Sequence, residues 1–105
     1  MTRGDVYRVR LPQRGGHEQH GSRYAVLVQA DELLGLSTVL VAPTSRSVRA
    51  ASFRPEVDIA GQRTRVMVEQ LRALDVRRLD DLAGRLDPSE MREVDEALSL
   101  VLALG

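Results

Sequence analysis

The sequence contains no cysteine and no lysine, and only 3% of its residues are aromatic. Without cysteine, neither a disulfide framework nor a thiolate metal site can form. With so few aromatic residues, the core must be built from Leu, Val and Ala. No apolar run reaches the length of about 18 residues that a membrane-spanning helix needs, and the polar start Met1-Thr2-Arg3-Gly4-Asp5 has no signal core. We therefore expect a cytoplasmic protein without a membrane partner.

The formal net charge is zero, but the two halves of the chain differ in sign. Residues 1–55 carry eight Arg and four acids, a net of +4, and residues 56–105 carry seven Arg and eleven acids, a net of −4. Guanidinium groups suit bidentate phosphate contacts, so the positive half would face RNA. A GC-rich coding bias also explains the exclusive use of arginine, and charge alone does not decide between these interpretations.

Hydrophobic periodicity predicts five or six short strands before residue 87. The expected strands are residues 5–11, 24–28, 38–42, 53–59, 64–71 and 82–86. Two of them, 24–28 and 38–42, are continuous apolar runs, which indicates strands buried on both faces. Pro43 is expected to end the second of these runs, and Pro55 predicts an edge position for strand 53–59.

One amphipathic helix is predicted at the C-terminal end. Asp87 can cap this helix, Pro88 suits its first position, and Glu90 completes a capping box. Apolar residues then recur every three or four positions as far as Leu102. One further helical turn is expected at residues 75–79. Short strands followed by one such helix predict a mainly β fold, a small, partly open barrel with the helix packed against it.

Two predicted polar loops hold the residues best suited to chemistry. The loop at 13–23 contains two histidines, a glutamate and an arginine, and the loop at 44–51 contains hydroxyls and arginines. Such residues are often only solvated side chains, with hydroxyls bonded to nearby backbone. They also suffice to cleave RNA through its own 2′-hydroxyl, which needs a proton acceptor, a cation near the leaving oxygen and donors for the phosphorane.

Other chemistries lack their residues. There is no glycine-rich phosphate loop of the Gly-Lys-Ser/Thr type, since the chain has no lysine. No nucleophile-elbow pattern surrounds any serine. His17 and His20 lie three apart, but the sequence identifies no further ligands that would complete a metal site with them.

Five parts of the chain, in the same order, resemble the MazF/PemK (Kid) toxins of bacterial toxin–antitoxin pairs. They are Arg3-Gly4-Asp5-Val6-Tyr7, Gly16-His17-Glu18-Gln19 with Arg23, Val41-Ala42-Pro43-Thr44-Ser45, Val68-Glu69-Gln70-Leu71-Arg72-Ala73-Leu74-Asp75, and Gly84-Arg85-Leu86 with Met91-Arg92-Glu93-Val94-Asp95-Glu96-Ala97-Leu98. The second is similar to that family's Gly-Ser-Glu-Gln…Arg-Pro loop, and the fourth to its Glu-Gln-Ile-Arg-Thr segment. Because the resemblance runs from about Arg3 to Ala103, we expect residues 1–105 to form one MazF/PemK-like domain.

This resemblance implies an SH3-like, PemK-like barrel of five to seven strands with a C-terminal helix, in agreement with the periodicity, and a homodimer. It also implies a sequence-specific, ribosome-independent endoribonuclease that cuts single-stranded RNA without metal or cofactor, leaving a 2′,3′-cyclic phosphate and a 5′-hydroxyl. A MazE-like antitoxin would inhibit the enzyme. Operator DNA would be bound, if at all, only through the antitoxin complex.

By the same resemblance, Arg23 would stabilise the phosphorane and leaving oxygen electrostatically, because a guanidinium with a pKa above about 12 is a poor proton donor. Glu18 would orient Arg23 or accept the 2′-proton. The active hydroxyl falls on Ser45, with the adjacent Thr44 as second candidate. Tyr24 stands where the family has proline and offers a base a stacking surface. Further RNA contacts are expected from His17, Gln19, His20, Arg46, Arg49 and Gln70.

Two other functions are compatible with such a fold. A CcdB-like poison would bind DNA gyrase and cleave nothing, and an SH3-like interaction module would have no toxicity. The presence of Glu18, Arg23 and Ser45 favours the nuclease over the gyrase poison. Of the three, only the nuclease would cut a long RNA in the presence of EDTA.

Overall fold

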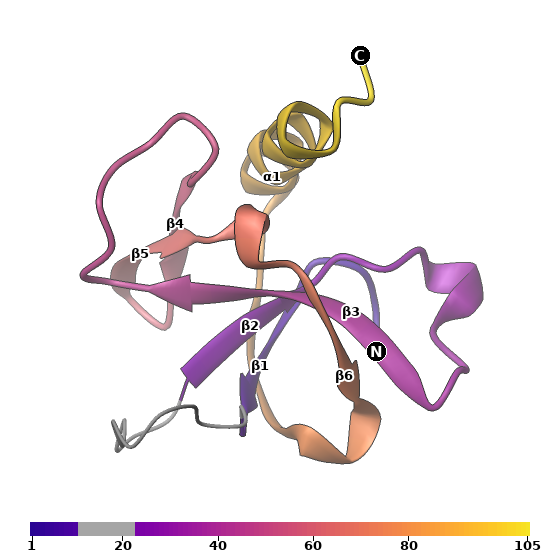
Figure 1. Ribbon diagram of the computed structural model, residues 1–105. Helices are drawn as coiled ribbons and strands as arrows, with labels where there is room; N and C mark the ends of the chain where they lie inside the picture. The colour runs from indigo at the N-terminus through magenta and orange to yellow at the C-terminus, as the bar shows by residue number, and fades with distance from the viewer. Residues whose placement is uncertain (11–22) are drawn as a thin grey trace, which may run out of the picture.

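The computed structural model describes residues 1–10 and 23–105, and within them it contains seven strands, three short 3-10 helices and one α-helix (Figure 1). The strands are β1 (Asp5–Val9), β2 (Arg23–Leu27), β3 (Thr38–Ser45), β4 (Glu56–Ile59), β5 (Gln62–Val66), β6 (Arg72–Asp75) and β7 (Leu79–Arg85). The helices are η1 (Asp31–Leu33), η2 (Val68–Gln70), η3 (Val76–Arg78) and α1 (Pro88–Leu102). The predicted mainly β fold with one C-terminal helix is confirmed.

The strands form a curled antiparallel sheet, a half-barrel, in the order β4-β5-β3-β2-β1-β7, with β6 also paired to β3. Helix α1 lies across one side of this sheet, as Figure 1 shows. The strand order ends at β4 and at β7, so the edge position predicted for strand 53–59 is confirmed. The predicted start at residue 53 is wrong, because β4 begins at Glu56 and Pro55 precedes it.

Two apolar clusters stabilise the half-barrel, one on each face of its central strands. The first packs under α1 and includes Val26 and Val94, and the second includes Ala25 and Leu27 on the opposite face. Successive residues of a strand point to opposite faces, and β2 meets a different cluster with each face. This explains the apolar run at 24–28, and its predicted burial on both faces is confirmed. The same prediction for 38–42 is wrong, because Thr38 and Leu40 are exposed on one face of β3.

The prediction that Pro43 ends its strand is wrong, because β3 continues through Pro43 to Ser45. β3 pairs with β6 over Thr38–Val41 and with β5 over Thr44–Ser45, so Pro43 lies where β3 changes partner on that side. Its carbonyl accepts a hydrogen bond from the Met67 N–H at 2.8 Å on the same side. The N–H that proline lacks would point to this side, between the segments of β3 that pair with β6 and with β5. The pairing of β3 with β2 on the other side is therefore unaffected.

Other strand boundaries also differ from the prediction. β1 ends at Val9, and β5 runs over Gln62–Val66 and gives way to η2 where the strand was expected to continue to Leu71. β6 was not predicted, and β7 begins at Leu79, three residues earlier than expected. Both strands are short of buried apolar side chains, so neither shows a clear hydrophobic period. The helical turn expected near residues 75–79 is confirmed as η3.

The start of α1 agrees with the sequence prediction. The Asp87 carboxylate accepts the Glu90 N–H at 2.7 Å and the Glu90 carboxylate accepts the Asp87 N–H at 3.0 Å, which together form the capping box. Gly4 lies against this end of the helix with a φ of +96°, and a Cβ there would stand 3.2 Å from the Met91 side chain. Among the described residues, no helix is long and apolar enough to cross a membrane.

Candidate functional site

A hollow of about 810 Å³ opens where the start of β2, the end of β3 and the β4–β5 hairpin meet. Its lining residues are Arg23, Tyr24, Thr44, Ser45, Arg46, Ser47, Val48, Ile59, Ala60, Gln62, Thr64, Met67 and Gln70. Two of the lining residues, Arg23 and Arg46, are positively charged. Within the described part of the chain, no acidic residue lines the hollow. In a protein of zero net charge, this concentrates positive charge at one concave surface, which suits a polyanion.

The antiparallel pairing of β2 with β3 brings the proposed chemical groups together. Ala25 lies opposite Pro43 in the register, so the residues before Ala25 lie beside those after Pro43. The hydroxyl of Thr44 accordingly donates a hydrogen bond to the backbone carbonyl of Tyr24 at 2.9 Å. Arg23 and Ser45 follow at the same end of the two strands and both line the hollow.

Thr44 and Ser45 differ in the availability of their hydroxyls. Thr44 is only 4% exposed, and its hydroxyl proton is used in the bond to the Tyr24 carbonyl. Ser45 is half-buried, and its Oγ accepts the Ser47 N–H at 3.2 Å and lies 3.3 Å from the Ser47 Oγ. The expected loop at 44–51 is wrong for these two residues, since both belong to β3. A paired sheet end holds them more rigidly than a loop would.

Tyr24 is held between two elements. Its ring packs against the core cluster under α1, and the Arg8 guanidinium lies 5.8 Å from the ring centroid, within cation–π distance. Arg8 and Tyr24 are register partners in the β1–β2 pair. The ring is therefore fixed at the rim of the hollow, with part of its surface exposed.

The predicted site residues fall into three groups. Those that line the hollow are Arg23, Tyr24, Thr44, Ser45, Arg46 and Gln70. Arg49 is exposed and is not one of the lining residues. His17, Glu18, Gln19 and His20 lie outside the described residues.

The segment between β3 and β4 is connected to η2 by an ion pair. Both Nε and Nη2 of Arg54 donate to Oε2 of Glu69, at 2.9 and 2.7 Å, and Arg54 also donates to the Arg49 carbonyl at 3.1 Å. The guanidinium lies 5.3 Å from the centroid of the Phe53 ring. Glu69 directly precedes Gln70, so this ion pair fixes the relative position of two sides of the hollow.

Sequence reasoning missed the contribution of the β4–β5 hairpin to the hollow. Ala60, Gln62, Thr64 and the nearby Met67 all line it. The Ala60-Gly61 pair between two short strands was the available signal, since glycine at the second position suits a tight hairpin turn. The predicted strand began at Thr64, whereas β5 begins at Gln62.

In the described part of the chain, three side chains have shifted pKa values, and all three lie away from the hollow and serve local structure. Hydrogen bonds from the Arg77 side chain and backbone lower the pKa of Asp75 to about 2, and Asp75 in turn raises the pKa of Arg77. The buried Asp5 raises the pKa of Arg85 through a 2.8 Å hydrogen bond. Within the described residues, no three His, Asp or Glu side chains are grouped closely enough to hold a metal ion.

The sequence matches, over residues 2–102, the profile of a family described as the PemK-like, MazF-like toxins of type II toxin–antitoxin systems. It is 39% identical over 106 aligned residues to a protein of Mycobacterium tuberculosis named as a candidate toxin, with 99% of each chain covered. It is 36% identical over 111 aligned residues to the endoribonuclease EndoA of Bacillus subtilis, covering 99% of this chain and 96% of that one.

The fold is similar to those of solved toxins. A mycobacterial endoribonuclease solved in complex with its cognate antitoxin has a TM-score of 0.84 at 21% identity, covering 100% of this chain and 97% of that one. MazF from Deinococcus radiodurans has a TM-score of 0.81 at 21% identity, covering 98% and 96% of the two chains. At these identities the likeness concerns the fold, and it confirms the expected PemK-like architecture, which the structure shows as a half-barrel with seven described strands.

Proposed function

This chain belongs to the PemK-like, MazF-like toxins of type II toxin–antitoxin systems, and we propose that it is an endoribonuclease that cleaves single-stranded RNA without a metal ion. The observation that carries the proposal is the hollow in which Arg23 and a serine hydroxyl lie together without an acidic neighbour among the described lining residues. The relative from Bacillus subtilis is named an endoribonuclease. The proposed substrate is messenger RNA in the cytoplasm, cut at short sequences independently of the ribosome.

In the proposed reaction the 2′-oxygen of one nucleotide attacks the adjacent phosphorus, and the bond from phosphorus to the 5′-oxygen breaks. The 2′-proton passes to a general base, for which Glu18 is the candidate, and the leaving 5′-oxygen takes up a proton from water or a neighbouring acid. The products are a 2′,3′-cyclic phosphate and a 5′-hydroxyl. The nucleophile belongs to the RNA itself, so the protein needs only to position groups and stabilise charge.

Arg23 is assigned to the phosphorane. It stands at the start of β2, where its guanidinium brings positive charge to the hollow. Ser45 is assigned as the active hydroxyl, because it is the more accessible of the two and donates no bond to a backbone carbonyl within the described residues. Thr44 holds β3 against β2 through its bond to the Tyr24 carbonyl.

RNA contacts outside the reacting centre are assigned to the rim. Tyr24 would stack on a base, Arg46 would contact a phosphate, and Gln70 would bond to a base or sugar. His17, Gln19, His20 and Arg49 are assigned to the flanking nucleotides.

We also propose that the protein works as a homodimer and is inhibited by a cognate MazE-like antitoxin. A mycobacterial endoribonuclease with the same fold was solved with its cognate antitoxin. A MazE–MazF complex from Deinococcus radiodurans has the fold as well, with a TM-score of 0.77. An acidic segment of the antitoxin would lie in the positive hollow and compete with RNA.

The test is incubation of the purified protein with a long single-stranded RNA in EDTA. We expect cleavage with 2′,3′-cyclic phosphate ends, and we expect Arg23→Ala to lower the rate by roughly a hundred- to a thousandfold, the effect of losing a preorganised charge contact. Circular dichroism should show an unchanged fold for the variant. An intact RNA with the wild-type protein would refute the proposal and favour a gyrase poison or an interaction module, whereas normal turnover by Arg23→Ala would refute only the arginine assignment.

A further inference from the structure

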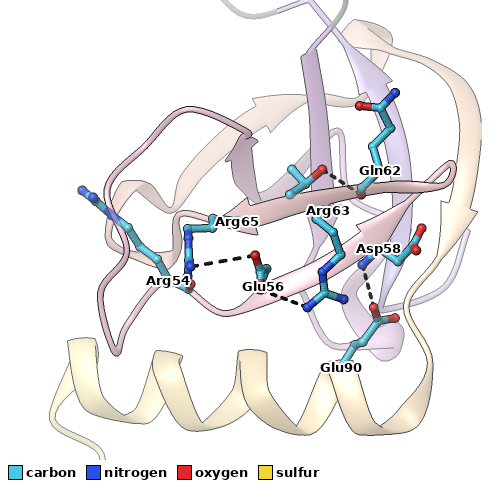
Figure 2. Close-up of polar contacts among 8 residues, drawn as sticks. Arg54, Glu56, Asp58, Gln62, Arg63, Arg65 and Glu90 are labelled. Atoms are coloured by element: carbon cyan, nitrogen blue, oxygen red, sulfur yellow. Dashed lines mark hydrogen bonds and ion pairs between the residues drawn. The ribbon is translucent and has the colours of Figure 1, made fainter.

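The β4–β5 hairpin carries a glutamine to the hollow, and the chemistry assigned above does not use it. β4 and β5 are joined by Ala60 and Gly61, whose φ angles of 52° and 80° are those of a tight hairpin turn with two left-handed residues. Gln62 follows directly, is exposed and lines the hollow. Figure 2 shows its side chain pointing away from α1, whereas Arg63 points toward the helix.

The hairpin is fixed to the start of α1, so Gln62 has a defined position. The Asp58 carboxylate accepts the Gly61 N–H at 3.0 Å. The Glu90 carboxylate accepts the Asp58 N–H at 2.8 Å, as Figure 2 shows. Glu90 is itself held by the capping box. The Gln62 carbonyl also accepts the Thr64 hydroxyl at 3.2 Å. These contacts fix the backbone that carries Gln62, and a residue held on a rigid backbone loses less freedom when it binds a ligand.

The chemistry around Gln62 suits a base rather than a phosphate. A carboxamide has two N–H donors and a carbonyl acceptor, which can match the donor and acceptor groups on the edge of a base. Within the described residues, its own carboxamide forms no hydrogen bond. Ile59 and Met67 provide apolar lining in the same hollow, and Arg23 and Arg46 provide the positive charge. A nucleotide has both a phosphate and an unstacked base to place among these groups.

We propose that Gln62 is a specificity-determining residue, whose carboxamide hydrogen-bonds the edge of one unstacked base of single-stranded RNA bound in the hollow. The proposal rests on the proposed ribonuclease function and deepens it, because it assigns part of the sequence preference to the β4–β5 hairpin. Gln62 has no role in bond breaking.

The experiment is cleavage of a random-sequence RNA pool, followed by sequencing of the new 5′ ends. Gln62→Ala removes the carboxamide, and Gln62→Glu keeps its size but replaces the two donors by an acceptor. We expect the base preference at one position of the cleavage site to fall by about fivefold or more in Gln62→Ala, the discrimination that one good side-chain–base pair provides. In Gln62→Glu we expect the preference at that position to move toward bases that present a donor.

Arg63→Ala is the matched control, since Arg63 is adjacent in sequence but points to the opposite face and pairs with Glu56 at 2.9 Å. Its cleavage profile should equal that of the wild type. If Gln62→Ala and the wild type give the same profile, the inference is overturned while the ribonuclease function stands. An equal change in Arg63→Ala would also overturn it, because the effect would then come from hairpin stability.

A binding measurement separates the inference from the reaction. The wild type and Gln62→Ala are used to select sequences from a random pool of 2′-deoxy-substituted, uncleavable oligonucleotides. Different selected bases at one position support the inference even if the wild type cleaves no RNA, an outcome that would refute the proposed function alone. Identical selected sequences overturn the inference.

Discussion

At the scale of single residues, two adjacent hydroxyls in β3 have different surroundings, from which we predict different roles. Thr44 is 4% exposed and its hydroxyl is bonded to the Tyr24 carbonyl, whereas Ser45 stands half-buried at the hollow. We predict that Ser45→Ala lowers RNA cleavage by roughly a hundredfold, as the loss of one transition-state donor does. The free energy of unfolding should change by less than about 0.5 kcal/mol.

Thr44→Ala is the matched control for Ser45→Ala. It leaves the Tyr24 carbonyl without its hydrogen-bond donor, so we expect the free energy of unfolding to fall by about 1–2 kcal/mol. Below the unfolding temperature, we expect it to lower cleavage less than Ser45→Ala does. Urea unfolding and single-turnover cleavage measure both quantities. A larger loss of cleavage in Thr44→Ala would move the chemical role to Thr44.

The carboxylate of Asp75 makes a pH-dependent contribution to the stability of the folded protein. Hydrogen bonds from the Arg77 side chain and N–H lower its pKa from 3.8 to about 2 in the folded protein. Because the folded pKa lies below the unfolded one, the contribution to stability is complete above about pH 4 and is lost as the pH falls toward about 2. We predict that the difference in unfolding free energy between wild type and Asp75→Asn decreases over this interval.

Urea unfolding at several pH values measures that difference. The contributions of the other carboxyl groups are the same in both proteins and cancel in the difference. Arg77→Ala supplies the control, because it removes the guanidinium that lowers the Asp75 pKa most. In that background the effect of Asp75→Asn should vary less with pH. A difference that stays constant down to about pH 2 would contradict the ion-pair explanation.

At the scale of elements, the start of α1 and the β4–β5 hairpin form one unit through Glu90. Its carboxylate accepts the N–H of Asp87 within the helix start and the N–H of Asp58 in β4. We predict that Glu90→Ala lowers the free energy of unfolding by about 1 kcal/mol or more, because it removes half of a capping box and the link to the hairpin. Thermal or urea unfolding measures the change.

Glu93→Ala is the matched control one turn further along α1. Glu93 is exposed and makes no hydrogen bond or ion pair within the described residues. Its replacement should change stability by less than about 0.5 kcal/mol. Equal effects of the two variants would mean that the general charge of the helix, and not the Glu90 contacts, explains the loss.

At the scale of the whole molecule, charge is divided in space as well as along the chain. Arg23 and Arg46 stand at the hollow, whereas α1 carries Glu90, Glu93, Asp95 and Glu96 against Arg92 alone. An RNA of several nucleotides is longer than one such hollow. Two copies related by a two-fold axis would join their positive surfaces into one groove.

We therefore predict a homodimer whose affinity for RNA falls steeply with salt, because arginine–phosphate contacts release counterions. Light scattering gives the mass, and titration of an uncleavable RNA at several salt concentrations gives the slope. Arg46→Ala should reduce that slope by about the amount expected for the loss of one phosphate contact. A monomer at micromolar concentration, with binding insensitive to salt, would refute the groove and the expected mode of inhibition.

Local sequence patterns predicted the structure correctly where it depends on residues that are close in sequence. The capping residues Asp87 and Glu90 contact each other within one helical turn, so their spacing predicts their bonds. The apolar run in β2 indicated burial on both faces, which the two core clusters explain. Strand β6 was missed because its stability comes mainly from pairing with β3, and its sequence carries little apolar periodicity.

The sequence by itself therefore determined the mainly β class, the helix start and the burial of β2 on both faces, because these follow from periodicity and capping chemistry. The candidate site residues were proposed from motifs of short range. Tertiary structure decided which residues meet at the hollow. Pro43 remains within β3 only because β3 changes partner there, and Gln62 lines the same hollow as Arg23 and Ser45 only through the pairing of β5 with β3. Contacts between residues distant in sequence depend on sheet register and packing of the whole chain, which no local pattern specifies.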